Sequence, residues 1–553
     1  MAGPHAFVGG RILTMDPWRA TAEVAVIEKG RIAAVGERAL LAAYPGAQRE
    51  DLTGRTLLPG FIDAHNHLSI AALHPLWADL SRTCTREELA RALAEQAARE
   101  PEARWVRGAG WDEAAGGLVP DRHALDALGL DRPVIVVHYS LHQCVVSSQA
   151  LDELGIGRTT PDPPGGTIER GPDGEPTGLL VERAWSEAHA RSLAAYRDPA
   201  RWGGLIAARA RALVADGITC VHDAACPPSA ESVYRTLAGA GALPISVLMM
   251  PHGEALLTPP SPVRLEGPIT GEGDERLRVG PIKLFADGGI APALEVTIQG
   301  ERARYGVCFA DLAEHALRAV RRGFRVAVHA MGNAGLAAAL EALARAARLR
   351  PDDDHRFRIE HGTLASRAQL AEMAALGAIA VVQPGFLHHM GRLVENFPLE
   401  QEIWLPFGEM ARAGLRLAGS SDDPCAFHEP LRTSAYGATR RTGSGGVLGA
   451  EQALGYEEWL RAYTAGAAYA GGQEDERGSI TPGKRADLVV VEGDLDAEHP
   501  PRVVQTWVGG ERASYADPRP CLGSGTDNES AARWIERRPC LGRRSRRGRL
   551  AGA

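Results

Sequence analysis

The middle of the chain alternates short apolar runs with alanine-rich stretches. The apolar runs lie at 218–221, 245–249, 282–285, 326–328, 357–359, 378–382 and 415–418, and stretches typical of helices, such as 337–348 and 367–376, lie between them. Strand followed by helix, repeated along the chain, predicts a parallel α/β sheet. About eight such units favour a closed (β/α)8 barrel of the TIM type, whose sites lie at the C-terminal ends of its strands.

The two ends of the chain have a different pattern. β-rich runs broken by glycine occupy 6–13 and 24–36, and similar runs return at 486–491 and 503–510. We therefore predict a small β-sandwich domain built from residues 1–58 and 477–515, and a barrel domain at 59–476. Between about residues 70 and 200 the alternation is interrupted by turns such as 161–166, which predicts a long insertion over the barrel mouth.

The last segment, 516–553, is polar and rich in arginine. It is predicted to be a disordered tail without a catalytic role, and a basic handle for anionic partners is the alternative. The rest of the composition is that of a globular protein, and 553 residues are more than one ordinary core needs. The net charge of −8 gives no general case for nucleic-acid binding.

Cellular context follows from what the sequence lacks. No apolar run approaches the roughly 20 residues of a membrane helix, and residues 1–5 do not resemble a secretion signal. The cysteines include no Cys-x-x-Cys pair, and Cys144, Cys220 and Cys308 lie in apolar or strand-like surroundings. We therefore expect a cytoplasmic protein with reduced cysteines and no membrane partner.

Residues 59–67, PGFIDAHNH, are the most informative stretch for chemistry. They place His65 and His67 two apart after an apolar run, and alternate residues of a strand point the same way. Two such imidazoles can chelate one metal ion, although they do not identify the metal. An ordinary structural histidine pair is the competing explanation.

Four further residues stand at predicted strand ends: Lys283, His329, His361 and Asp422. A lysine within an apolar strand is costly to bury as a cation, so it either pairs with a carboxylate or reacts with carbon dioxide to give an anionic carbamate that can bridge two metals. Histidines ending successive strands favour metal binding over a structural role. An aspartate at a strand end can bind metal and move protons, or it can cap the next helix.

Taken together, these motifs resemble the amidohydrolase superfamily, in the branch that contains N-substituted formamide deformylase and related metal-dependent hydrolases. The resemblance extends from residue 6 to about 512. It rests on residues 59–67, 217–223, 283–288, 329–332, 358–361, 421–424, 463–464 and 478–488.

The resemblance implies a metal-dependent hydrolase that cleaves a non-peptide C–N bond of an amide, formamide or cyclic amide by metal-activated hydroxide. By this resemblance His65, His67 and Asp422 hold one metal, and His329 and His361 hold a second. Lys283, carrying a carbamate derived from CO2, is the bridge. Asp422 is then the residue that moves the proton. Zinc is the first expectation, with one or two ions per subunit.

The departures from the family pattern concern the substrate side. Where the family usually has Arg-x-Asp-Gly-His, this chain has residues 138–142, HYSLH, and Asn333 stands where an aspartate is usual. We infer that catalysis is retained while the substrate pocket has changed. The candidates for substrate binding are His142, Trp111, His222 and Gln383, each with core or loop packing as the alternative.

Two other functions were weighed against this hydrolase. A deaminase of a small heterocycle on the same barrel would usually lack the bridging lysine and carry a glutamate after the third histidine. Lys283 and Asn333 therefore favour the hydrolase. A catalytically silent binding protein would have lost ligands, and all six are present. The expected partner is a small-molecule substrate, and a homodimer is compatible with the predicted fold.

Overall fold

The computed structural model describes residues 3–513, apart from 114–117, 195, 197, 254–262, 396 and 398. The predicted tail, 516–553, lies outside these residues. Two compact units are present within the described chain. One contains residues up to Leu73, Asp162–Thr167 and the chain from Glu182 onward, and the other contains His74–Pro161 and Ile168–Val181.

Two parallel sheets form the centre of the larger unit, as the alternation of strands and helices predicts. The first has the order β15-β14-β13-β6, with β15 (Leu277–Val279), β14 (Ser246–Pro251), β13 (Ile218–Cys226) and β6 (Phe61–Asn66). The second has the order β16-β19-β20-β22-β24, with β16 (Ile282–Phe285), β19 (Val326–Ala330), β20 (Arg358–His361), β22 (Ile379–Val382) and β24 (Arg416–Gly419). The edge strands β6 and β24 lie next to each other, as do β14 and β16.

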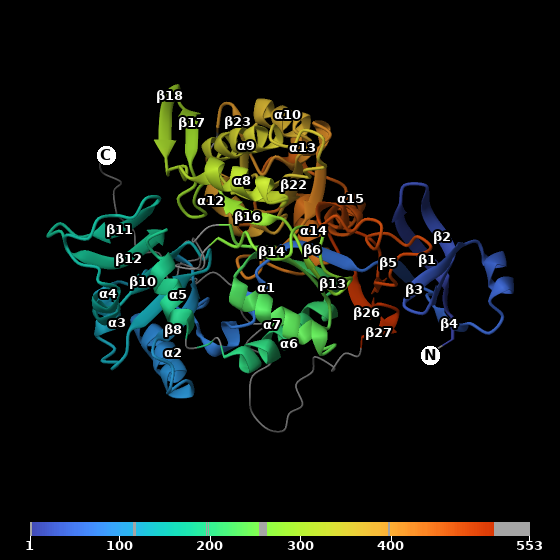
Figure 1. Ribbon diagram of the computed structural model, residues 1–553, viewed down its shortest axis with the longest axis horizontal. Helices are drawn as coiled ribbons and strands as arrows, with labels where there is room; N and C mark the ends of the chain where they lie inside the picture. The colour runs from blue at the N-terminus through green and yellow to red at the C-terminus, as the bar shows by residue number, and fades with distance from the viewer. Residues whose placement is uncertain are drawn as a thin grey trace. The chain divides into compact units, whose positions relative to one another are not determined.

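Helices follow these strands along the chain, which gives a TIM-barrel-like α/β fold (Figure 1). Helix α10 shows why one such segment is helical, because Ser366 and Gln369 form a capping box at its start. The helices of this unit include α6 (Pro199–Ala215), α7 (Pro228–Gly239), α8 (Leu312–Arg321), α9 (Asn333–Ala347), α10 (Arg367–Ala375), α13 (Phe407–Arg412), α14 (Pro430–Thr439) and α15 (Tyr456–Arg461).

Strands from both ends of the chain share one further sheet, as Figure 1 shows in blue and red. Leu57 of β5 is paired with Val490 of β25, antiparallel, and Phe7, Leu488 and Trp507 belong to the same buried cluster. The order is β27-β26-β25-β5-β1-β2-β3, with β4 beside β1: β1 (His5–Asp16), β2 (Arg19–Glu28), β3 (Arg31–Gly36), β4 (Gln48–Asp51), β5 (Arg55–Pro59), β25 (Leu488–Glu492), β26 (Arg502–Val508) and β27 (Glu511–Arg512).

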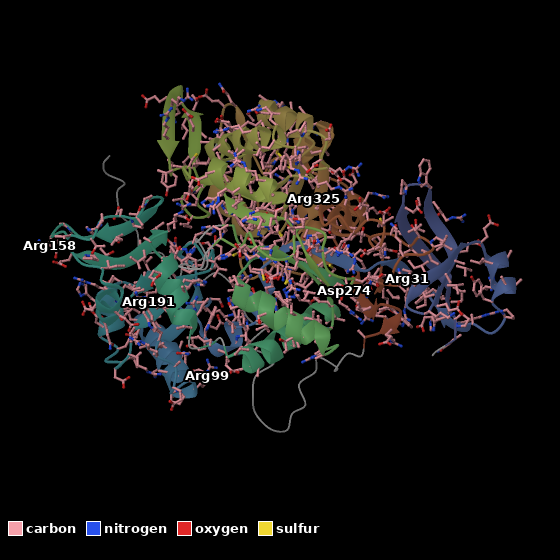
Figure 2. The ribbon with its side chains drawn as sticks, in the orientation of Figure 1. Arg31, Arg99, Arg158, Arg191, Asp274 and Arg325 are labelled. Atoms are coloured by element: carbon pink, nitrogen blue, oxygen red, sulfur yellow. The ribbon has the colours of Figure 1, made fainter. Side chains whose placement is uncertain are left out.

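Charged pairs tie this sheet to the loop before β15. The carboxylate of Glu275 pairs with Arg31 and, at 2.7 Å, with Arg485. Arg485 also pairs with Asp487 at 3.2 Å. Arg31 and the neighbouring Asp274 are labelled in Figure 2. Arg485 is largely buried, so this network connects the end sheet to the loop before β15 within the larger unit.

The smaller unit takes its described residues from within the range 70–200, where an insertion is predicted. Its sheet has the order β11-β12-β10-β9-β8-β7, with β7 (Ala78–Asp79), β8 (Val106–Trp111), β9 (Val134–His138), β10 (Gln143–Val146), β11 (Gly166–Arg170) and β12 (Pro176–Glu182). Its helices include α2 (Arg86–Arg99), α3 (Arg122–Asp126) and α4 (Ser148–Leu154). Residues after Glu182, including α6, belong to the larger unit because they lead directly into β13.

Two expectations from composition can be compared with the structure. Cys144 and Cys220 are free and buried, as expected, whereas Cys308 is free but exposed, because it lies in the loop after β18 (Glu301–Tyr305) and not in a strand. Cys84 is disulfide-bonded, contrary to the expectation of reduced cysteines. Among the described helices, none combines the length and apolar character that crossing a bilayer requires.

Candidate metal centre

The six predicted ligands all lie in the larger unit, at or just after strands of the two parallel sheets. His65 lies in β6, Lys283 in β16, His329 in β19 and His361 at the end of β20. His67 follows β6, and Asp422 follows β24. All six are buried: His65, His67, Lys283, His329, His361 and Asp422 are each at most 8% exposed.

The structure brings these side chains together. One ligand atom each from His65, His361 and Asp422 lies within 4.8 Å of the others, a group that could hold a metal ion. Asp422 Oδ1 lies 3.1 Å from His67 Nε2 and 3.4 Å from His65 Nε2. The His329 and His361 ring centroids are 4.6 Å apart. Lys283 lies on β16, which pairs with β19, the strand that carries His329.

Three of the histidines hold their Nδ1 atoms in hydrogen bonds that leave Nε2 for a ligand. His67 Nδ1 donates to the carbonyl of Ala224 at 2.9 Å, since a carbonyl can only accept. His361 Nδ1 lies 2.9 Å from Gln383 Oε1, and His65 Nδ1 lies 2.5 Å from Glu360 Oε2. Among the described residues, the buried His65 Nε2 has no hydrogen-bond partner. Metal-binding histidines characteristically donate their second ring nitrogen in this way, so these residues fit a metal.

A buried charged network lies behind His65. Arg358 donates to Glu360 Oε1 at 2.7 Å, to Glu360 Oε2 at 3.1 Å and to the carbonyl of Ala64 at 2.6 Å. Its remaining terminal nitrogen lies 3.1 Å from His222 Nδ1. The positive charge of Arg358 balances the negative charge of Glu360, which would otherwise be buried without a partner. The network therefore fixes the ring orientation and the tautomer of His65.

Asp63 joins the first histidine strand to the loop that carries Asp422. Its carboxylate accepts from the backbone nitrogen of Ser421 at 2.9 Å and from the Ser421 hydroxyl at 2.5 Å. The backbone nitrogen of Asp422 in turn donates to the carbonyl of His65 at 2.8 Å. Asp422 has φ +61° and His361 has φ +77°, values that non-glycine residues adopt rarely and at some energetic cost. Strained backbone held by surrounding bonds is typical of a functional site.

The electrostatic environment favours the neutral forms of His65 and His361 and the ionised form of Asp422. Burial lowers the pKa of His361 to about 4, against the opposing effect of Asp422. Burial, followed by the positive charge of Lys283, holds the pKa of His65 well below its ordinary value. Burial would raise the pKa of Asp422, but the contact with His67 and the neighbouring histidines bring it below its usual range. Neutral imidazole and ionised carboxylate are the forms that bind metal.

Asn333 shows what the departure from the family pattern does. Its side chain accepts from the backbone nitrogen of Glu295 at 2.9 Å and donates to the carbonyl of Glu295 at 2.7 Å. An aspartate could accept but not donate, so the amide is required for both bonds. The substitution thus fastens β17 (Leu294–Ile298) to the start of α9.

The four predicted substrate-binding residues, unlike the six predicted metal ligands, do not all lie in the larger unit. Gln383 bonds to His361, and its amide donates to Ser420 Oγ at 2.9 Å, while His222 contacts Arg358. Both therefore contact the residues around the metal ligands. Trp111 and His142 lie in the smaller unit, where Trp111 packs in the hydrophobic core and the backbone nitrogen of His142 donates to Ser140 Oγ at 3.2 Å.

The positioning residues Glu360 and Arg358 were not predicted as site residues from the sequence. A signal was available, because two opposite charges two apart in a buried strand point the same way and can form a pair. Asp423, the residue after Asp422, pairs with Arg209 at 2.8 Å.

Comparison with known proteins identifies the family. Residues 48–513 match the amidohydrolase family. The chain belongs to the amidohydrolase family. It is 32% identical over 504 residues to N-substituted formamide deformylase of Arthrobacter pascens, which covers 88% of this chain and 93% of that protein. It is 27% identical over 530 residues to Protein LONG AFTER FAR-RED 3 of Arabidopsis thaliana, covering 91% and 90% of the two chains.

The fold agrees with a solved structure. An uncharacterized metal-dependent hydrolase from Pyrococcus horikoshii superimposes with a TM-score of 0.71 at 24% identity, covering 90% of this chain and all of that one. The predicted family is confirmed, and this amidohydrolase is a metal-dependent hydrolase that acts on non-peptide carbon–nitrogen bonds.

Proposed function

We propose that this amidohydrolase hydrolyses an N-substituted formamide or a related small amide to a carboxylate and an amine. The observation that carries the proposal is the arrangement of His65, His67 and His361. Their Nδ1 atoms are bonded to Glu360, Ala224 and Gln383, and Asp422 Oδ1 lies close to Nε2 of His65 and of His67. The likeness to a protein named N-substituted formamide deformylase supports the formamide over a cyclic amide. The alternative reaction is deamination of a small heterocycle, and the test below distinguishes the two reactions.

Six residues would hold the metal. His65, His67 and Asp422 would hold the first ion, and His329 and His361 would hold the second. Lys283 would supply a shared anionic ligand as a carbamate, because its ammonium form is unfavourable when buried, whereas a carbamate carries a negative charge. Zinc suits a set of imidazole and carboxylate ligands. When bound, the metal lowers the pKa of water and polarises the amide carbonyl.

Asp422 moves the proton in this reaction. Its carboxylate is ionised and buried next to His67, so it accepts a proton from the attacking water. The water oxygen forms the new bond to the carbonyl carbon, the C–N bond breaks, and Asp422 delivers the proton to the departing nitrogen. No second acidic residue is needed in this scheme, because Asp422 both accepts the proton and delivers it.

The remaining architecture is part of the same proposal. The adjacent edges of the two parallel sheets close one (β/α)8 barrel at 59–476, and the end sheet, from 1–58 and 477–515, forms a β-sandwich. Trp111 and His142 remain the proposed substrate-binding residues, whereas His222 and Gln383 act by positioning metal ligands. The enzyme is cytoplasmic and forms a homodimer.

The reaction is tested by a hydrolysis screen with zinc-reconstituted enzyme. We expect N-substituted formamides to release formate and an amine in equal amounts. Removal of metal with a chelator should abolish turnover, and one to two equivalents of zinc should restore it. Formate is measured enzymatically and metal by mass spectrometry. Release of ammonia from heterocyclic amines without formate would instead support the deaminase, and a fully active metal-free enzyme would contradict the whole proposal.

Glu360→Gln tests the positioning network. The amide is nearly isosteric but removes the negative charge that His65 and Arg358 share. We expect the affinity for zinc to fall by about 10–100-fold, as is typical when an outer partner of a metal ligand is lost. Zinc affinity is measured by competition with a chromogenic chelator. Glu341→Gln, an exposed glutamate in α9, is the matched control and should leave zinc affinity unchanged. Equal affinities for all three proteins would contradict the positioning role.

A further inference from the structure

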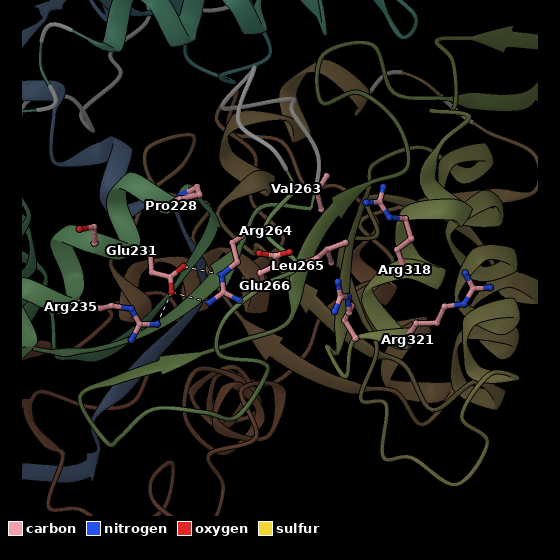
Figure 3. A pocket seen from close by; sticks show the side chains of 11 residues that line it. Pro228, Glu231, Arg235, Val263, Arg264, Leu265, Glu266, Arg318 and Arg321 are labelled. Carbon is pink, nitrogen blue, oxygen red and sulfur yellow. Dashed lines mark hydrogen bonds and ion pairs between the residues drawn. The ribbon is translucent and has the colours of Figure 1, made fainter.

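A cavity of about 800 Å³ lies in the larger unit between α7 and the end of α8 (Figure 3). We call it the arginine cleft, because Arg235, Arg264, Arg318, Arg321 and Arg322 line it. None of the six proposed metal ligands is among its lining residues. In Figure 3, Glu231 and Arg235 stand on one side, Arg318 and Arg321 on the other, and Arg264 and Glu266 between them.

Three arginines of the cleft come from one face of α8 and its C-cap. Arg318, Arg321 and Arg322 are spaced i, i+3 and i+4, so they share a face of the helix. Among the described residues they have no ion pair and no side-chain hydrogen bond. Many exposed arginines elsewhere in the chain are paired, for example Arg302 and Arg304 with Glu295. Basic residues in the last turn stabilise a helix through its dipole even without a ligand, so a binding site here needs a second observation.

Arg264 supplies that observation from a different segment. It is 8% exposed and is held by Glu231, with Nε 3.1 Å from Oε2 and Nη2 2.9 Å from Oε1, while Nη1 donates to the carbonyl of Pro268 at 2.6 Å. A guanidinium has five N–H groups, so two of them have no partner in the described structure. A buried, oriented arginine with donors to spare is a feature of a built anion site.

The charge balance also favours an anion. The lining residues include five arginines but only two glutamates, Glu231 and Glu266, and Glu231 is already shared by Arg235 and Arg264. This local excess of positive charge occurs in a chain whose net charge is −8. Such a concentration of charge attracts anions to the cleft.

We propose that the arginine cleft binds a phosphorylated small molecule. The guanidinium fork matches the oxygens of a phosphate group, and Val263, Leu265 and Pro228 offer apolar contact to an organic portion. The volume lies within the range of about 300–1,000 Å³ typical of small-molecule sites, whereas a protein partner would need a larger and flatter surface. This proposal is independent of the reaction proposed above.

The test is calorimetric titration of the zinc-loaded, full-length enzyme with adenosine 5′-diphosphate and with inorganic pyrophosphate at low salt. We expect the double variant R318A/R321A to weaken binding of the diphosphate by about 10-fold or more. R302A/R304A removes the same charge from exposed arginines on β18 and is the matched control, with no change expected. Metal content and circular dichroism verify that each variant is intact.

The two probes separate the sources of the phosphate. Tighter binding of adenosine 5′-diphosphate than of pyrophosphate supports an organic phosphate, and equal binding that depends on Arg318 and Arg321 supports free phosphate at the same cleft. Binding that is unchanged in R318A/R321A would place the phosphate at the metal centre and overturn the proposal. Absence of binding by either probe would also overturn it.

Discussion

Replacing Asp422 by asparagine is expected to lower kcat by about 1,000-fold, within the range that a lost general acid–base contributes. The amide has nearly the shape of the carboxylate but cannot accept the proton of the attacking water. The other ligands remain in place, so the protein should still fold and retain much of its metal. Steady-state kinetics on a formamide substrate and metal analysis of the same preparation measure the two effects separately.

The neighbouring aspartate is the matched control for this experiment. Asp423→Asn removes the same charge one residue away, where the carboxylate is paired with Arg209 and not with His67. We expect this variant to be less stable in thermal unfolding while its kcat stays close to that of the wild type. If both variants lost kcat equally, the loss would reflect disturbance of the loop, and Asp422 would have no special role in proton transfer.

Replacing Lys283 by alanine is expected to remove about one metal equivalent per chain and to lower kcat/KM by at least about 100-fold, since it would delete the proposed bridging ligand. Lys283 is 1% exposed, so the substitution leaves a cavity beside the histidines. A short carboxylate can enter that cavity and replace the oxygens of the carbamate. Added propionate should therefore restore part of the activity and of the metal content.

Propionamide provides the matching control, because it has the size of propionate without the charge. Rescue by propionate alone supports an anionic bridge, and rescue by both compounds would mean that the cavity only needs to be filled. Wild-type activity in Lys283→Ala would show that the bridge is dispensable. Lys283→Arg keeps the positive charge but cannot form the carbamate in the same place, so it should resemble the alanine variant.

The six candidate ligands could be identified from the sequence because each lies in or just after an apolar strand, although Lys283 is near the start of β16 and not at its predicted end. In a parallel arrangement the strand ends gather on one side, so the order His-x-His, Lys, His, His, Asp is enough to bring them together. The roles of Gln383 and His222 could not be predicted in this way. Both contact residues of other strands, and strand order and depth are not visible in the spacing of residues along the chain.

The bounds of the insertion also could not be predicted accurately from the sequence. The expectation of 70–200 followed composition, and composition does not distinguish an inserted unit from the helix that leads into the next strand. Residues after Glu182 return to the larger unit, where the side chain of Trp202 in α6 donates to the carbonyl of Ser69 at 2.8 Å. This long-range contact joins the residues after Glu182 to the larger unit, and no local sequence pattern predicts it.

The sheet formed by both chain ends has a consequence for biosynthesis. Leu57 emerges from the ribosome more than 400 residues before its partner Val490. At about 5–20 residues per second, β5 waits tens of seconds with an open hydrogen-bonding edge. An apolar edge strand in that state can pair with another nascent chain. Chaperone demand should therefore concentrate on this first segment, and a chain terminated before β25 should aggregate even though every metal ligand has been synthesised.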